Sequence, residues 1–187
     1  ICNSMQQALD DQEFIMYLQP KVDLETNKIV GAEALTRWQR KDGKFMFPDQ
    51  FIPLFEKNGF IIQLDFYIYE CACKAIKKWE KLGIEPVTIS VNVSRVHLNT
   101  DDFVEKVMEL VERYKIKHEY LEFELTESIF LDNTESAIST MHELREKGFY
   151  VSIDDFGAGY SSLNLLKDMT TDVLKLDKEF FGGGDMK

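Results

Sequence analysis

The feature that most constrains the fold is a regular alternation of helical and strand segments that follows an initial pair of strands. Residues 14–22 and 29–35 have the composition of strands, and the turn sequence DLETNK between them predicts a hairpin. From Pro48 onward the order is helix, strand, helix, strand, helix, strand. This order is typical of a parallel sheet joined by crossover helices, so we expect an α/β fold.

The bounds of the later segments follow from periodicity and from helix end signals. Pro48 opens a short helix, a long helix over 61–81 ends at Gly83, and Asn99, Thr100 or Asp101 caps a helix that runs to Tyr114. Strands are expected at 87–93, 121–125, 150–153 and 173–176, and helices at 133–147 and 161–167. Together with the two strands of the hairpin, these make six strands. An eight-stranded barrel needs two more and typically about 250 residues.

The two ends of the chain are interpreted separately from the rest. Residues 1–12 are polar with a helical pattern, and we interpret them as a helical lead-in from an upstream segment. Residues 13–187 then form one domain, which ends in Gly182-Gly183-Gly184 and is expected to be incomplete at its C-terminus. A barrel without its last two strands would expose two sheet edges and an apolar interior, so we expect it to be marginal, to aggregate, or to pair with another copy.

Charge and cysteine usage exclude some classes of protein. The net charge of -11 argues against general nucleic-acid binding, although an acidic protein binds phosphate ligands when metal ions lie between the negative groups. The three cysteines are an odd, sparse set, which fits a reducing compartment and predicts a cytoplasmic location. The sequence has no signal-peptide pattern and no apolar run of membrane-spanning length, so we expect no membrane segment in this chain, even if a larger parent is membrane-anchored.

Polar side chains fall at or near the ends of the expected strands. The carboxyl ends of parallel strands gather at one mouth, where active sites form. We therefore expect one group of side chains there, with Glu33 facing the same space: Asn92, Glu124, Asp154, Asp155 and Lys175.

This group contains hard oxygen ligands and no His or Cys, which suits Mg²⁺ or Mn²⁺. Adjacent Asp154 and Asp155 could hold two metals, and such a pair can support phosphodiester cleavage. Taken singly, each acid is more often a solvated surface charge, and Lys175 could simply extend to the surface. Composition alone leaves the metal site and the ordinary polar surface as open alternatives.

Seven sequence blocks, in order and at fitting intervals, resemble the EAL domain family. Glu33-Ala34-Leu35 lies within GAEALTRW and looks like the motif that names the family. The other blocks cover about residues 14–180: LQPKVDLETNKIVG, PDQFIPLFEKNGFI, SVNVSRVHL, LEFELTES, IDDFGAGYSSL and VLKLDKEF. The resemblance implies a modified TIM-like (β/α) barrel with an antiparallel first strand. It also implies hydrolysis of cyclic di-GMP to linear pGpG with one or two Mg²⁺ or Mn²⁺ ions.

The resemblance also implies roles for individual residues. Glu33, Asn92, Glu124 and Asp154 would be metal ligands, and Asp155 would join the second metal. Glu33, Asp155 and Lys175 would form the catalytic set. Lys175 would contact the attacking water, and positioning that water is the role we favour because a free lysine has a pKa near 10.4.

Further implied roles concern the ligand and the assembly. Gln19, Leu35, Arg37 and Asp177 would meet cyclic di-GMP. Glu127 would brace the loop 156–162, which often lies at the family's dimer contact, so a homodimer is expected. An upstream GGDEF or sensor domain would fit the helical lead-in.

The sequence departs from the family after the last block. A Glu-containing segment and a later Gln-Gly segment of the family are absent, and the first of them supplies a carboxylate near the second metal. We therefore expect the second metal to bind poorly. The alternative to a phosphodiesterase is a catalytically inactive module that senses cyclic di-GMP or regulates a partner. Sensor versions often lose metal-binding acids, whereas this chain keeps them.

Overall fold

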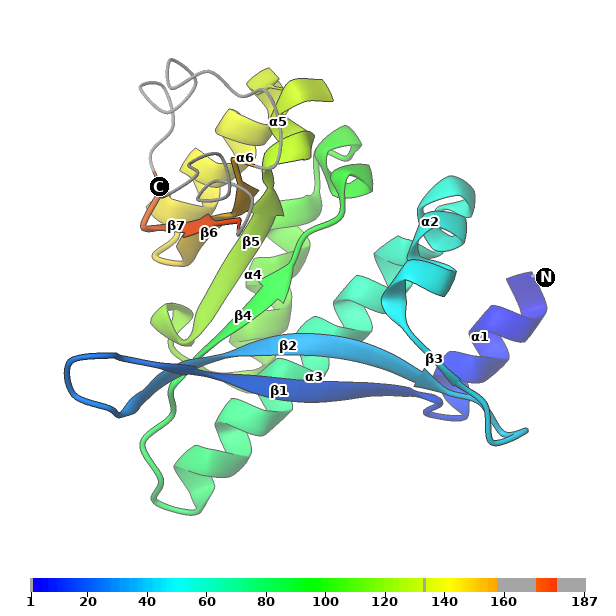
Figure 1. Cartoon of the computed structure of the whole chain (residues 1–187), viewed down its shortest axis with the longest axis horizontal. Helices are drawn as coiled ribbons and strands as arrows, with labels where there is room; N and C mark the ends of the chain where they lie inside the picture. The colour runs from blue at the N-terminus through cyan, green and yellow to red at the C-terminus, as the bar shows by residue number, and fades with distance from the viewer. Residues whose placement is uncertain (1, 133, 158–170, 178–187) are drawn as a thin grey trace, which may run out of the picture.

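The computed structural model describes residues 2–132, 134–157 and 171–177 (Figure 1), without the side chains of 2–4, 131 and 132. The expected helix at 161–167 and the glycines 182–184 lie outside these residues. Helices are α1 (Cys2–Asp10), α2 (Pro48–Asn58), α3 (Ile61–Lys81), α4 (Phe103–Tyr114), α5 (Glu127–Asp132) and α6 (Thr134–Glu146), with 3₁₀ turns η1 (Arg95–Asn99) and η2 (His118–Tyr120). Strands are β1 (Phe14–Val22), β2 (Ile29–Gln39), β3 (Phe45–Met46), β4 (Thr88–Asn92), β5 (Leu121–Thr126), β6 (Tyr150–Phe156) and β7 (Val173–Leu176).

One mixed sheet organises these elements in the order β1-β2-β4-β5-β6-β7. β1 and β2 form the predicted antiparallel hairpin, and β2, β4, β5, β6 and β7 run parallel to one another. The short β3 pairs with the end of β2. Within the described residues β1 and β7 each have one neighbour, so the sheet is open between them, and Figure 1 shows the hairpin extending past the parallel strands.

The two faces of the parallel sheet differ in polarity because β4, β5 and β6 alternate in sequence. Ile89, Val91, Phe123 and Val151 are fully buried in the hydrophobic core, which α3, α4 and α6 share. The opposite face carries the intervening residues of these strands, which are Ser90, Asn92, Glu122, Glu124, Ser152 and Asp154. The expected apolar interior is therefore wrong for the described strands, since their inner face is largely polar.

Several details differ from the sequence-based expectations. Strand β2 runs to Gln39 and not to residue 35. Asp102, and not Asn99, Thr100 or Asp101, is the N-cap of α4, because 95–99 form a 3₁₀ turn that Ser94 caps. Strand β6 continues to residue 156, so Asp154 and Asp155 lie inside the strand and not after it. The two-residue β3 and the helix α5 were not expected at all, because short elements carry too little periodicity to be recognised.

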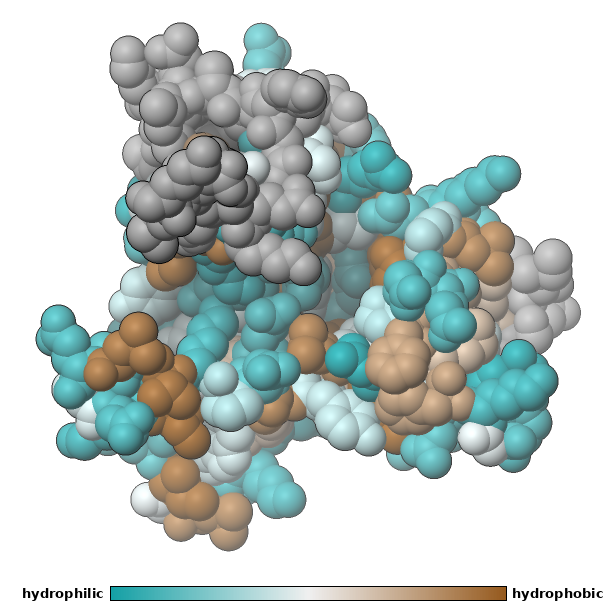
Figure 2. All heavy atoms as spheres, viewed as in Figure 1, coloured by the Kyte–Doolittle hydropathy of each residue, from teal (hydrophilic) through white to brown (hydrophobic). Residues whose placement is uncertain are grey.

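The turn of the hairpin exposes apolar side chains. Leu24 is 95% exposed, and Ile29 and Val30 are more than half exposed. Figure 2 shows this apolar surface as a brown group at the lower left, where Figure 1 places the hairpin turn. Within the described residues, none of the helices has the length and apolar character that crossing a bilayer requires.

The core around β5 generates a stability prediction. Phe123 is 0% exposed and its ring contacts the rings of Tyr69, Phe103 and Phe149. Phe123→Ala should lower the free energy of unfolding by about 3–5 kcal/mol, because it leaves a cavity that these rings cannot fill. Phe45→Ala is the matched control, since Phe45 is 41% exposed, and should cost less than about 1 kcal/mol. Urea unfolding followed by circular dichroism measures both, and equal losses would contradict the assigned core.

Candidate metal centre

Strand register brings the predicted polar residues to one face of the sheet. Asn92 pairs with Glu124 across β4 and β5, and Thr126 pairs with Asp154 across β5 and β6. Gln19 pairs with Glu33 across the hairpin. Registered partners on neighbouring strands point to the same side, so these side chains share the inner face.

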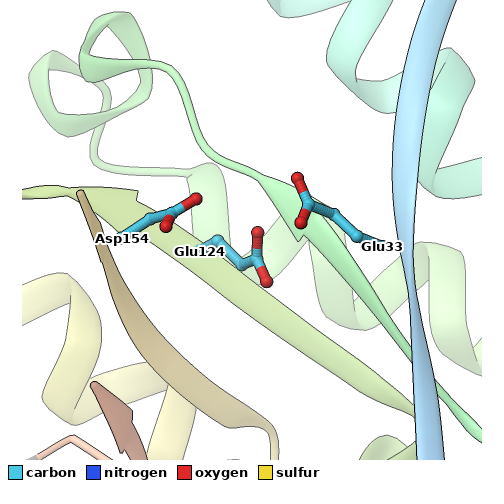
Figure 3. Close-up of side chains that lie close together, drawn as sticks. All are labelled: Glu33, Glu124 and Asp154. Atoms are coloured by element: carbon cyan, nitrogen blue, oxygen red, sulfur yellow. The ribbon is translucent and has the colours of Figure 1, made fainter. Parts of the chain in front are cut away.

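Three carboxylates converge at the centre of this face. One oxygen each from Glu33, Glu124 and Asp154 lies within 4.8 Å of the other two. Figure 3 shows the three side chains reaching toward one another from different strands, namely β2, β5 and β6. The sequence analysis named all three, and the structure brings them together as expected.

The ammonium group of Lys175 on β7 lies among these carboxylates. Its Nζ donates to Glu124 Oε2 at 2.8 Å, to Glu33 Oε2 at 3.1 Å and to Asp154 Oδ2 at 3.1 Å. Burial opposes the charge of Lys175, but the hydrogen bond and negative charge of Glu124 and the charge of Glu33 outweigh it and raise the pKa of Lys175. The three donors of the ammonium are all used by the cluster.

The residues of the cluster fit a divalent cation. The donor set consists of carboxylate oxygens, which are the ligands that Mg²⁺ and Mn²⁺ prefer. The same three carboxylates already bind one positive charge, and the Glu124 side chain is 0% exposed. A cation among three carboxylates this close stabilises their ionised forms, which would otherwise repel one another and take up protons. The structure therefore fits a metal held by Glu33, Glu124 and Asp154.

Asp155 lies beside the cluster in an unusual backbone conformation. Its φ is 55°, in the left-handed region, and the pairing of β6 with β7 is irregular between residues 153 and 156. Its backbone N–H donates to Asp154 Oδ1 at 2.9 Å. Burial, followed by the charges of Asp154 and Asp177, raises the pKa of the Asp155 carboxyl. Asp155 is thus close to Asp154 without belonging to the group of three carboxylates.

The remaining predicted residues lie around the cluster. The Asn92 side chain is exposed at the end of β4, and its backbone C=O accepts a hydrogen bond from the Tyr69 hydroxyl at 3.0 Å. Leu35 and Arg37 follow Glu33 at steps of two along β2, so they share its face, as does exposed Gln19. Arg37 is half-buried and lies over the Phe47 ring at 5.5 Å.

A pocket of about 440 Å³ adjoins the predicted site on the side of Leu35 and Asn92. Its lining also contains polar residues that the sequence analysis did not name: Glu56, Asp65, Ser94, Arg95 and Thr126. The Ser94 hydroxyl donates to Glu56 Oε1 at 2.6 Å, and the Asp65 carboxylate lies 2.9 Å from His97 Nε2. The blocks PDQFIPLFEKNGFI and SVNVSRVHL were the available signal for Glu56, Ser94 and Arg95, but they do not say which side chains face a pocket.

Glu127 contacts the segment that carries the two aspartates. It is buried at the start of α5, and its Oε2 accepts a hydrogen bond from the Gly157 backbone N–H at 2.7 Å. Gly157 has a φ of 95°, which a side chain would strain. Of the loop 156–162 that Glu127 was expected to brace, only Phe156 and Gly157 lie within the described residues.

This contact generates a prediction about local stability. Glu127→Ala should leave the Gly157 N–H without its acceptor and speed hydrogen exchange across residues 154–157. Glu135→Ala, at an exposed position in α6, is the matched control and should leave that exchange unchanged. Hydrogen exchange followed by mass spectrometry measures both variants. Unchanged protection in Glu127→Ala would contradict a bracing role.

Comparisons with known proteins identify relatives of this chain. Residues 2–186 match the family model described as the EAL domain. The chain is 32% identical to the bifunctional diguanylate cyclase/cyclic di-GMP phosphodiesterase MucR of Pseudomonas aeruginosa, and 35% identical to the probable cyclic di-GMP phosphodiesterase PdeB of Escherichia coli. These alignments cover 96% and 94% of the chain but only 26% and 34% of the relatives. The chain therefore spans about a quarter to a third of these relatives.

Solved structures show the same architecture. The PaMucR phosphodiesterase in complex with c-di-GMP has a TM-score of 0.88 at 32% identity, with 97% of this chain and 73% of that chain covered. The FimX EAL domain of Pseudomonas aeruginosa bound to c-di-GMP has a TM-score of 0.85 at 20% identity over 97% and 73% of the two chains, a likeness of fold alone. These likenesses confirm the predicted TIM-like (β/α) barrel fold with an antiparallel first strand.

Proposed function

This chain belongs to the EAL domain family, and from that premise we propose that it carries the metal site of a phosphodiesterase that hydrolyses cyclic di-GMP to linear pGpG. The observation that carries the proposal is the convergence of Glu33, Glu124 and Asp154 around one positive charge. The names of the relatives support the substrate, since both MucR and PdeB are named for cyclic di-GMP phosphodiesterase activity.

The metal would be Mg²⁺ or Mn²⁺, as one or two ions. Glu33, Asn92, Glu124 and Asp154 would hold the first ion, and Asp155 would join a second. When bound, the ions would supply electrostatic stabilisation of the charge that develops on the phosphodiester and its leaving oxygen. The left-handed φ of Asp155 interrupts the alternation that would otherwise direct adjacent side chains of β6 to opposite faces, which supports a place for Asp155 at a second ion.

The chain's own residues would orient the reactants. Lys175 donates to all three carboxylates in this structure. If a metal ion took its place among them, the ammonium would be free to position the attacking water by donation, and this is the role we assign to it. Gln19, Leu35 and Arg37 line the same face as Glu33, which supports contact with the ligand. Arg37 offers two parallel donors to a phosphate, and Asp177 would lie at the same mouth beyond β7.

Partners and location are also proposed. The name of MucR combines a cyclase with a phosphodiesterase, which supports an upstream GGDEF or sensor domain in the parent protein. The exposed apolar hairpin turn supports a homodimer. Cys71 and Cys73 are free thiols, which supports a cytoplasmic location.

The proposal predicts a metal-dependent reaction. The chain incubated with cyclic di-GMP and Mn²⁺ or Mg²⁺ should yield pGpG, and EDTA should stop the reaction. Glu33→Ala should abolish product with little effect on folding, because it removes one carboxylate from the cluster. Glu25→Ala, at an exposed position in the hairpin turn, is the matched control and should keep full activity. Chromatography of the nucleotides measures the product.

The outcomes of that assay separate the two classes of function. Cleavage that survives Glu33→Ala would contradict the assigned metal site. Binding of cyclic di-GMP without cleavage, by this chain and by its longer parent, would favour the sensor module instead. Cleavage by the parent alone would assign the activity to the site together with segments outside this chain.

Arg37 generates a prediction about ligand affinity. Arg37→Lys keeps the charge but loses the planar pair of donors, so the dissociation constant for cyclic di-GMP should rise about 10- to 100-fold. Arg40→Lys, one residue past the end of β2 and largely exposed, is the matched control and should change it little. Calorimetric titration of each variant with cyclic di-GMP, with Ca²⁺ in place of Mg²⁺, measures the dissociation constant. Unchanged affinity in Arg37→Lys would remove this residue from the ligand site.

A further inference from the structure

A second group of polar side chains lies on the same inner face, two residues before the carboxylate cluster along the strands. Ser90, Glu122 and Ser152 each precede by two residues a side chain at the mouth, namely Asn92, Glu124 and Asp154. Lys21 on β1 joins them, since it pairs with residue 31, two before Glu33. These four residues, Lys21, Ser90, Glu122 and Ser152, are called the lower polar group below.

Lys21 forms hydrogen bonds to three side chains on β4 and β5 at once. Its Nζ donates to Glu124 Oε1 at 2.9 Å, to Glu122 Oε1 at 3.1 Å and to the Ser90 hydroxyl. Glu122 Oε1 also accepts a hydrogen bond from the Ser152 hydroxyl at 2.7 Å. An ammonium group has three donors, so these contacts use all of them and hold the Lys21 head group in one place.

Gly31 leaves room for the lysine to reach this position. It is the register partner of Lys21 on β2. A Cβ at residue 31 would lie 3.6 Å from Lys21 Cδ and 3.2 Å from the Thr88 carbonyl oxygen. The stem of Lys21 therefore passes over a glycine on its way from the edge strand to the inner face.

The two carboxylate oxygens of Glu124 accept hydrogen bonds from two different lysines. Oε1 accepts from Lys21 below and Oε2 accepts from Lys175 above, while the side chain is 0% exposed. Resting on the proposed function, we propose that Lys21 is a positioning residue that holds Glu124 from below, so that one carboxylate oxygen stays directed at the metal. Lys21 itself lies outside the three-carboxylate group and touches it through Glu124.

An effect of the Lys21 charge and an effect on the position of Glu124 predict opposite changes in cation affinity when Lys21 is removed. Measuring that affinity therefore tests the inference. If Lys21 acted only through its charge, its removal would strengthen the binding of a cation, because one repelling positive charge is lost. If Lys21 holds Glu124 in place, its removal weakens metal binding, since a ligand without its outer partner loses its orientation. Outer partners of metal ligands typically contribute about 10- to 100-fold in affinity.

The experiment is a titration of the whole chain with Mn²⁺, followed by electron paramagnetic resonance of the free ion. Lys21→Met should raise the Mn²⁺ dissociation constant about tenfold or more. Lys28→Met is the matched control, because Lys28 is exposed in the same hairpin and its loss makes the same change in net charge. It should leave the dissociation constant unchanged.

A second variant separates positioning from general stabilisation. Lys21→Met leaves Glu122 buried without its cation, whereas Lys21→Met combined with Glu122→Gln removes that charge as well and should regain most of the stability. Urea unfolding measures the stability of both variants. The double variant should still bind Mn²⁺ as weakly as Lys21→Met, because Glu124 has no support from below in either.

Each outcome bears on a different claim. Unchanged or tighter Mn²⁺ binding in Lys21→Met would overturn the role of Lys21 and leave the metal site standing. Full recovery of Mn²⁺ binding in the double variant would show that Lys21 only stabilises the fold. Absence of Mn²⁺ binding in the unsubstituted chain would overturn the proposed metal site, and the inference with it.

Discussion

Mutual repulsion among Glu33, Glu124 and Asp154 is the constraint on which the inner face of this sheet depends. Their oxygens lie within 4.8 Å of one another, so each ionised pair repels by on the order of 3–4 kcal/mol at an effective dielectric constant of 20. A cation among them offsets this cost. Lys175 supplies that charge from β7, and Lys21 supplies a second one from β1 at the other oxygen of Glu124. The lysines of β1 and β7 thus neutralise acids that β2, β5 and β6 present.

The same arrangement connects the fold to the proposed chemistry. Strict alternation in β4, β5 and β6 places apolar side chains against the helices and polar ones on the inner face. The polar inner face is therefore where we propose a site for a charged ligand and its metal ions. An acidic chain can act on a phosphodiester in this way, because the cations lie between the two negative partners.

Much of the fold and of the candidate site could be predicted from the sequence. The features that could not be predicted have identifiable physical causes. The hairpin, the long helix α3 and the positions of Glu33, Asn92 and Glu124 follow from two-residue alternation and helix end signals. The extension of β6 through Asp155 could not be predicted, since it depends on a left-handed φ and an irregular pairing with β7. The contacts of Lys21 join residues 69 to 103 positions apart, and no local pattern encodes them.

The most direct test of the account is a crystal of this chain soaked in Mn²⁺, examined by anomalous diffraction at the manganese edge. The account predicts a peak bounded by the carboxylates of Glu33, Glu124 and Asp154. Manganese bound elsewhere on this acidic surface, with Lys175 still among the three carboxylates, would contradict it and would leave the cluster as an internal ion-pair network.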